Sequence, residues 1–155
     1  FYIIIKRWRW VFFIDATTLV SPDHRKIVEE NFDANLILAP DEIETISFDD
    51  LKRVDLKKIW ENKNNIKLSR NSIGVIVVDK NAFINTKYDE NYVGYGREDV
   101  DFVARLGEKG LKLKRCFKLI KIKHIHFEGR TPEDIQYYWK KNFEYWEKKG
   151  LNVVL

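Results

Sequence analysis

The chain contains the stretch Gly94-Tyr95-Gly96-Arg97-Glu98-Asp99-Val100-Asp101-Phe102-Val103-Ala104-Arg105, in which two glycines precede three acids and an apolar-periodic segment. Glycine has no Cβ, so the backbone at Gly94 and Gly96 can turn tightly and approach a ligand closely. Carboxylates are favoured in the first turn of a helix because that end of the helix dipole is positive. We therefore predict a helix over residues 98–109, ended by Gly110, whose acidic start lies at the rim of a pocket.

Segments with strand and helix patterns alternate along the rest of the chain. Continuous apolar runs rich in β-branched and aromatic residues predict buried strands, whereas capping residues and first-turn acids predict helices. Strands are expected over residues 10–14, 35–39, 74–78, 111–117 and 118–127. Helices are expected over residues 22–32, from 48 through 60, over 80–85, over 98–109 and from 132 onward. This alternation predicts an α/β fold in which helices flank a sheet.

The composition is that of a folded protein with a mildly basic charge. Of the 155 residues, 45% are hydrophobic and 34% are charged, which is enough apolar content for one domain with a core. The net charge of +4 is too small to indicate a nucleic-acid partner. A basic segment over residues 109–123 indicates either a solvated strand face or attraction to phosphates, an anionic acceptor or a membrane surface. Its basic residues are Lys109, Lys112, Lys114, Arg115, Lys118, Lys121 and Lys123.

The cysteine content and the first residues bear on location. Cys116 is the single cysteine, so no disulfide can form within the chain, and a reducing compartment fits this content. The apolar opening at residues 1–5 is too short to span a bilayer and lacks a signal-peptide cleavage pattern, so we expect a buried strand there. We expect a cytoplasmic protein, with peripheral membrane association as the alternative. The absence of methionine favours a fragment or a processed product.

Three motifs, in order, resemble those of GT-A glycosyltransferases. The pattern Gly-aromatic-Gly-x-Glu-Asp-x-Asp at residues 94–101 is similar to the acceptor-side motif of the β-1,4-galactosyltransferases, the bacterial chondroitin-polymerase type and related family 2 enzymes. Upstream, these enzymes have a strand that ends in Asp-x-Asp, which residues 11–23 resemble except that Thr17 replaces the second Asp. Downstream they place a histidine on a strand, a position filled here by His124 and His126.

The resemblance, from about residue 10 to about residue 128, implies the C-terminal portion of a GT-A-like (Rossmann-like) mixed sheet flanked by helices. Residues 1–130 would form the C-terminal part of the glycosyltransferase domain, and residues 131–155 an amphipathic helix and tail packed on it. The nucleotide-binding first half would be missing or supplied by a partner chain. The implied activity is inverting transfer of a sugar from a nucleotide-sugar donor, expected to be a UDP-sugar, to a hydroxyl of a glycan or lipid-linked glycan.

The acids have roles that the resemblance implies. Asp99 is expected to be the base that takes the proton of the acceptor hydroxyl, with Glu98 as the second choice. Close carboxylates also push their pKa values apart, so that one can be poised for proton transfer. The alternative is that these acids only cap the helix. Asp101 and Arg105 are expected to form an i,i+4 ion pair.

The glycine segment and the strand before it would bind substrate. The resemblance implies that Tyr95, which lies between Gly94 and Gly96, stacks on a sugar face, and that Arg97 and Asp15 also contact the substrates. The aromatic residues of the last helix are expected to pack against the body of the protein, with a sugar-stacking platform as the alternative.

A divalent cation, Mn²⁺ or Mg²⁺, would bridge the donor diphosphate, with Asp15 and one histidine as ligands. His124 is preferred and His126 comes next, because residues two apart on a strand share a face; the alternative is a hydrogen-bonded core histidine. His24 is expected at the surface. Since the neutral Thr17 is a weak ligand, three possibilities stay open: weaker metal binding, charge neutralisation by basic side chains, or a protein without catalysis.

Two other functions compete with the enzyme. The first is a degenerate, non-catalytic protein that binds a sugar or a nucleotide sugar, which the substitution at Thr17 favours. The second, ranked low, is a polyanion-binding module that uses the basic segment over residues 109–123.

Overall fold

The computed structural model describes residues 9–14, 18–53, 55, 59–60, 74–122 and 131–151. In this part of the chain five strands form one sheet in the order β1-β4-β3-β5-β2. They are β1 (Trp10–Phe13), β2 (Thr18–Val20), β3 (Leu36–Ile46), β4 (Ile76–Asp79) and β5 (Lys112–Ile122). β3 and β5 run parallel, while the other neighbouring strands are antiparallel, so the sheet is mixed.

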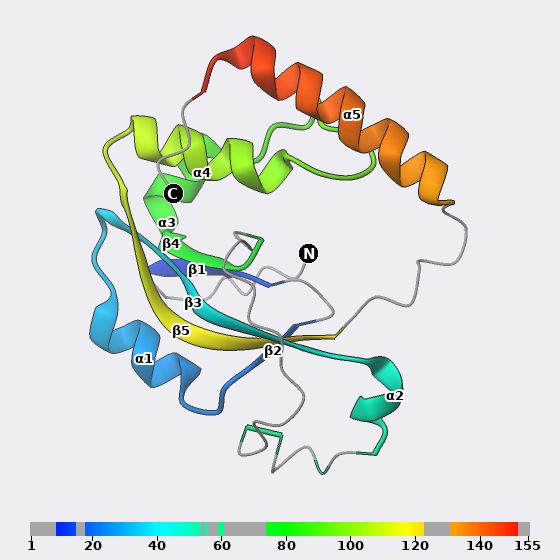
Figure 1. Cartoon of the computed structure of the whole chain (residues 1–155). Helices are drawn as coiled ribbons and strands as arrows, with labels where there is room; N and C mark the ends of the chain where they lie inside the picture. Colours follow the sequence, from blue (N-terminus) through cyan, green and yellow to red (C-terminus); the bar gives the residue numbers. More distant parts are fainter. Residues whose placement is uncertain are drawn as a thin grey trace.

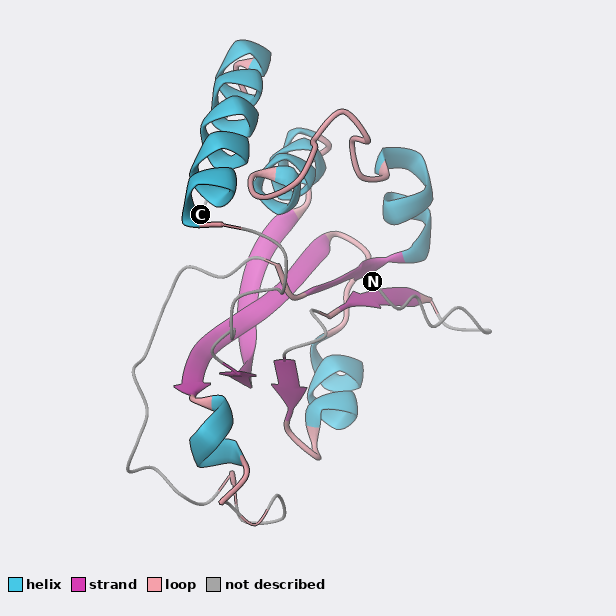
Figure 2. Cartoon of the chain, turned by 90° about the vertical axis from the view of Figure 1, so that its right-hand side faces the viewer, coloured by secondary structure: helices cyan, strands magenta, loops and turns pink. Residues whose placement is uncertain are grey.

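Helices cover both faces of this sheet. They are α1 (His24–Asn31), α2 (Phe48–Leu51), α3 (Lys80–Thr86), α4 (Glu98–Glu108) and α5 (Pro132–Lys149). Figures 1 and 2 show α1 on one face, α3 and α4 on the other, and α5 outside α4, on the side away from the sheet. The predicted α/β class, a mixed sheet flanked by helices, is confirmed.

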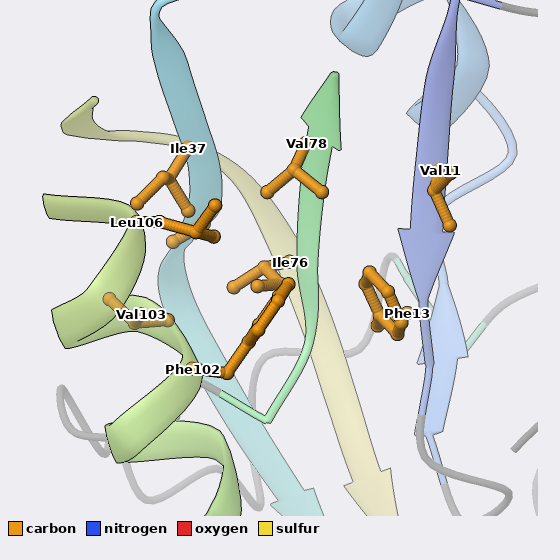
Figure 3. Packing of buried hydrophobic residues seen from close by; sticks show 9 residues of the cluster. Val11, Phe13, Ile37, Ile76, Val78, Phe102, Val103 and Leu106 are labelled. Atoms are coloured by element: carbon orange, nitrogen blue, oxygen red, sulfur yellow. The ribbon is translucent and has the colours of Figure 1, made fainter. Parts of the chain in front are cut away.

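Two apolar clusters fill the two faces of the sheet. Successive strand residues point to opposite faces, so Ile37 packs under α4 whereas Leu38 packs under α1. Figure 3 shows the first cluster, in which Phe102 of α4 points toward β4 and β1. This cluster comprises Val11, Phe13, Ile37, Ala39, Ile76, Val78, Phe102, Val103 and Leu106. The second comprises Val28, Leu38, Ile43, Val75, Val77, Phe117 and Leu119.

The two long strands differ from the sequence prediction. Instead of strands over 111–117 and 118–127, β5 is continuous through Ile122, because no turn residue interrupts the segment. β3 continues past Pro40, where the strand was predicted to have ended, and the pairing with β5 shifts register there. Proline has no N–H to donate, and such a β-bulge accommodates it within a strand.

Two helix predictions also need correction. α2 keeps the predicted cap, in which the Ser47 hydroxyl accepts from the Asp50 N–H at 3.0 Å, but it ends at Leu51 and does not run on to residue 60. α1 begins at His24, not at Pro22, and its N-cap residue makes no side-chain hydrogen bond. Among the described helices, none has the length and apolar character needed to cross a bilayer.

His24 was predicted at the surface, and this prediction is wrong. The side chain is 6% exposed; its ring stacks on Phe12 at 4.4 Å between centroids and meets Phe117 edge-on at 4.9 Å. Neither ring nitrogen has a hydrogen-bond partner in the described residues. Burial lowers the pKa of His24, while the nearby Asp23 carboxylate opposes this shift, so the imidazole packs as a neutral aromatic ring.

Candidate active site

The segment before α4 makes the tight turn that its glycines predict. Gly94 has a φ of +82° and Gly96 a φ of +95°, both in the left-handed region that favours glycine. Arg97 also has a positive φ, +76°, although it carries a side chain. We call residues 93–97 the glycine loop; it ends where α4 begins, at Glu98.

Glu98 and Asp99 lie side by side in the chain at the start of α4, and both are half-buried. Burial raises the pKa of Glu98, and the charge of Asp99 raises it further, while hydrogen bonds from backbone N–H groups partly oppose the shift. An Oδ1 atom of Asp99 accepts from the Val100 N–H at 2.7 Å. Glu98 therefore keeps its proton to a higher pH than an ordinary glutamate does, next to a second carboxyl group.

Tyr88 connects this acidic pair with the end of β1. Its ring stacks on Phe102 at 4.5 Å between centroids and lies 5.4 Å from the ring of Phe13. Burial raises the pKa of the Tyr88 phenol, and the charges of Asp99 and Glu98 add to this effect. The last residues of β1, the segment after α3 and the start of α4 thus meet at one place in the fold.

Asp101, one turn into the helix, is fully buried and receives three hydrogen bonds. Arg105 Nε donates at 2.6 Å, the Tyr92 hydroxyl at 3.1 Å and Lys149 Nζ at 2.5 Å. The predicted Asp101–Arg105 pair is confirmed. Lys149, near the end of α5, also donates to Asp89, so the network connects α5, α4 and the segment before the glycine loop.

α5 lies directly on the glycine loop, which runs between α4 and α5 in Figure 1. Asn142 is 3% exposed and bonds to the backbone of Val93 and Tyr95. The Arg97 guanidinium lies over three aromatic rings of α5, so the prediction that aromatic residues of this helix pack on the body is confirmed for them. These are Trp139, Phe143 and Trp146.

Sequence reasoning missed Asn142 and Lys149 as residues of this site. A signal for Asn142 exists in the sequence, since it lies at helical spacing from aromatic residues on both sides, where a lone amide is costly unless it is bonded. Lys149 carries no such signal, because lysine near the end of a helix is common on dipole grounds alone.

The predicted substrate residues that the structure describes lie together, whereas the predicted metal ligands cannot be placed. Gly94, Tyr95, Gly96 and Arg97 immediately precede Glu98 and Asp99, and Tyr95 is 52% exposed. The predicted metal ligands Asp15, His124 and His126 lie outside the described residues. So does Thr17, which replaces the second Asp of the Asp-x-Asp motif. Within the described part of the chain, no group of three or more His, Cys, Asp or Glu could hold a metal ion.

One family model matches the chain over residues 58–128, just under half of its length; the model is described as the N-terminal domain of galactosyltransferase. Among curated proteins there is no match. The matched range contains β4, α3, α4 and β5, and with them the glycine loop, both acids and the two predicted histidines. This match and the helix-flanked mixed sheet support a glycosyltransferase-like domain with a GT-A-like fold.

Proposed function

We propose that the chain is an inverting glycosyltransferase that moves a hexosyl group from a nucleotide sugar, a UDP-sugar, to a hydroxyl of a glycan or glycolipid. The observation that carries the proposal is the family match, which covers the glycine loop and the Glu98–Asp99 pair that follows it. In the reaction, the acceptor oxygen attacks the anomeric carbon as the bond to the diphosphate breaks. The nucleoside diphosphate leaves with the electron pair, and the acceptor proton passes to a carboxylate.

Asp99 is that carboxylate in our proposal, and Glu98 its neighbour. Burial raises the pKa of Glu98, so its carboxyl group holds a proton more readily than an ordinary glutamate does, and in our proposal a hydrogen bond from Glu98 orients the acceptor while Asp99 accepts the proton. Tyr95 supports the acceptor side of the proposal, since its half-exposed ring is available to stack on a sugar face.

The donor side rests on sequence and on the resemblance. Asp15 follows Phe13 of β1 by two residues in the chain, and Phe13 contacts Tyr88 beside the acidic pair. A carboxylate and an imidazole from His124, or from His126, suit Mn²⁺ or Mg²⁺, whose charge would neutralise the diphosphate. A partner chain that supplies further contacts to the nucleotide is also part of the proposal.

Transfer assays with a panel of UDP-sugars and glycan acceptors, with and without Mn²⁺, test the proposal. We expect turnover by the unchanged chain and a loss of about 10²- to 10⁴-fold in kcat for Asp99→Asn. Glu90→Gln changes an exposed acid just upstream of the glycine loop and is the matched control, with turnover unchanged. If Asp99→Asn keeps full turnover and Glu98→Gln is inactive, the base is Glu98 and not Asp99.

The degenerate binding protein is the second candidate, favoured by Thr17 at the position of a family carboxylate. Calorimetric titration of UDP and UDP-sugars separates it from the enzyme. Binding without turnover for any acceptor would support the degenerate protein, whereas metal-dependent binding with turnover supports the enzyme.

A further inference from the structure

We infer that α5 positions the acidic pair, with Asn142 and Arg97 as positioning residues that act through the glycine loop. The inference rests on the proposed function for its catalytic consequence. The way in which α5 holds the loop is visible in the structure itself, at three neighbouring places.

The first place is the buried amide of Asn142. Nδ2 donates to the Val93 carbonyl at 3.0 Å and to the Tyr95 carbonyl at 3.0 Å, and Oδ1 accepts from the Val93 N–H at 3.3 Å. Only the amino group can serve two carbonyl oxygens, so these contacts fix the orientation of the amide and use both of its donor hydrogens. One side chain of α5 thereby satisfies three backbone groups of the glycine loop.

The second place is the close approach of the loop backbone to α5. A Cβ at Gly94 would lie 2.4 Å from the Tyr138 ring, and a Cβ at Gly96 would lie 3.0 Å from the Trp139 ring. The two glycines therefore serve contact with the helix as well as the turn, because no other residue leaves room for the ring at Gly94.

The third place is Arg97, the last residue before α4. The guanidinium carbon lies 4.7 Å from the ring centroid of Phe143 and 5.2 Å from that of Trp146, an arrangement that attracts a cation to the ring faces. A positive φ is unfavourable for arginine, so the backbone there needs a compensating contact to persist. The aromatic rings of α5 supply that contact.

These contacts flank the acidic pair on both sides. Arg97 directly precedes Glu98 and Asp99, and Asp101, which Lys149 of α5 holds, follows two residues later. A rotation at Arg97 would turn the first residues of α4 and displace both carboxyl groups. Because a displacement of about 1 Å can cost about 100-fold in rate, loosening α5 should weaken catalysis without any contact to substrate.

Asn142→Ala in the full chain tests the inference, with Lys140→Ala, an exposed residue of the same helix, as the control. We expect kcat to fall about 10- to 100-fold and the acceptor KM to rise, with the donor KM unchanged. Hydrogen exchange at the amides of residues 93–101 should become faster at least about tenfold in Asn142→Ala and stay unchanged in Lys140→Ala. A merely destabilised protein would instead lose kcat in proportion to its folded fraction, with both KM values unchanged.

Three substitutions at Arg97 separate backbone strain from the aromatic contact. Arg97→Lys keeps a cation over the rings and should retain most of the kcat, whereas Arg97→Ala keeps the strain without the contact and should lose at least about tenfold. Arg97→Gly removes both the strain and the contact. This variant should therefore melt at a higher temperature than Arg97→Ala, while the amides of its glycine loop exchange as fast as those of Arg97→Ala.

The two proposals fail in different ways. If the unchanged chain transfers no sugar, the proposed function fails, and the exchange rates alone decide whether α5 holds the loop. If the chain is active and both Asn142→Ala and Arg97→Ala keep the kinetic constants and exchange rates of the unchanged chain, the positioning role is overturned.

Discussion

Asp101 and His24 are both buried titratable side chains, one on each face of the sheet, and the protein accommodates them in opposite ways. Asp101 has no exposed surface and accepts hydrogen bonds from Arg105, Tyr92 and Lys149. His24 is nearly as buried but lies between aromatic rings with no hydrogen-bond partner in the described residues. An imidazole can lose its charge near neutral pH, so burying it without hydrogen-bond partners costs less free energy than burying a carboxylate without them.

The difference shows on which face of the sheet polar contacts fix the positions of the neighbouring segments. Partners for Asp101 come from segments far apart in the sequence, so satisfying one charge fixes α5 and the segment before the glycine loop against α4. On the α1 face, by contrast, His24 is buried by packing against the rings of Phe12 and Phe117, with no polar partner in the described residues. The candidate site lies on the face where the polar contacts are specific.

Removing the carboxyl group of Asp101 should have the largest effect on stability. Asp101→Ala leaves two cations without their shared partner and should lower the free energy of unfolding by about 3 kcal/mol, measured by urea denaturation. Glu29→Ala removes an exposed carboxylate that pairs with Arg25 and should cost at most about 0.5 kcal/mol. Equal losses in the two variants would contradict the special role of the α4 face.

Gly94→Ala should come next. The substitution combines a positive φ with a Cβ that overlaps the Tyr138 ring, and we expect a loss of about 2 kcal/mol. Gly107→Ala is the matched control within α4, where a Cβ meets nothing within 4 Å. That variant should gain up to about 1 kcal/mol in the same denaturation experiment, because alanine favours a helix.

His24 should make stability depend on pH. Because its pKa is lowered by folding, the unfolded chain takes up the proton first, so the contribution is complete above the unfolded pKa of 6.5 and is lost as the pH falls below it. The slope cannot exceed about 1.4 kcal/mol per pH unit for one proton. His24→Phe should flatten this part of the profile between pH 7.5 and 5.5. A difference in unfolding free energy between the two proteins that does not vary with pH would show that His24 accepts its proton inside the fold.

Removal of the helix caps should give the smallest difference in the free energy of unfolding between the two faces. The Thr131 hydroxyl accepts from the Asp134 N–H in a capping box at the start of α5, whereas Asp23 makes no side-chain cap at α1. Thr131→Ala should therefore lower the free energy of unfolding by about 1 kcal/mol, and Asp23→Ala by less than about 0.5 kcal/mol. If both substitutions cost the same in thermal melts, capping does not distinguish the two helices.

Local signals in the sequence predicted the elements around the site. Gly110, with a φ of +90°, lies just past the end of α4, where its N–H bonds to the Gly107 carbonyl, and Thr131 with Pro132 opens α5 as expected. Such features depend on residues within one turn of each other, so the sequence displays them directly.

Features that depend on distant segments escaped prediction. The strand predicted over residues 35–39 is too short, because pairing with β5 carries β3 past Pro40 through a shift in register. His24 has charged neighbours in sequence, and only the packing of α1 against Phe12 and Phe117 buries it. The bonds of Asn142 to Val93 and Tyr95 likewise join residues that no periodicity connects. Asp15 and the two histidines lie outside the described residues, so their roles stay predictions.

The strand order has a consequence for how the chain folds. β3 lies between β4 and β5 in the sheet, yet it precedes both in the sequence, and its parallel pairing joins Leu36 to Lys112. β3 can pair with β5 only when the intervening chain, with α3 and α4, closes into a loop. Pairing between residues so far apart in the sequence is intrinsically slow. The segment over residues 58–128 that matches the family model contains β4 and β5 but not the strand between them. Expressed alone, that segment would have two strands with no common partner, so the unit that folds is larger than the unit that sequence similarity recognises.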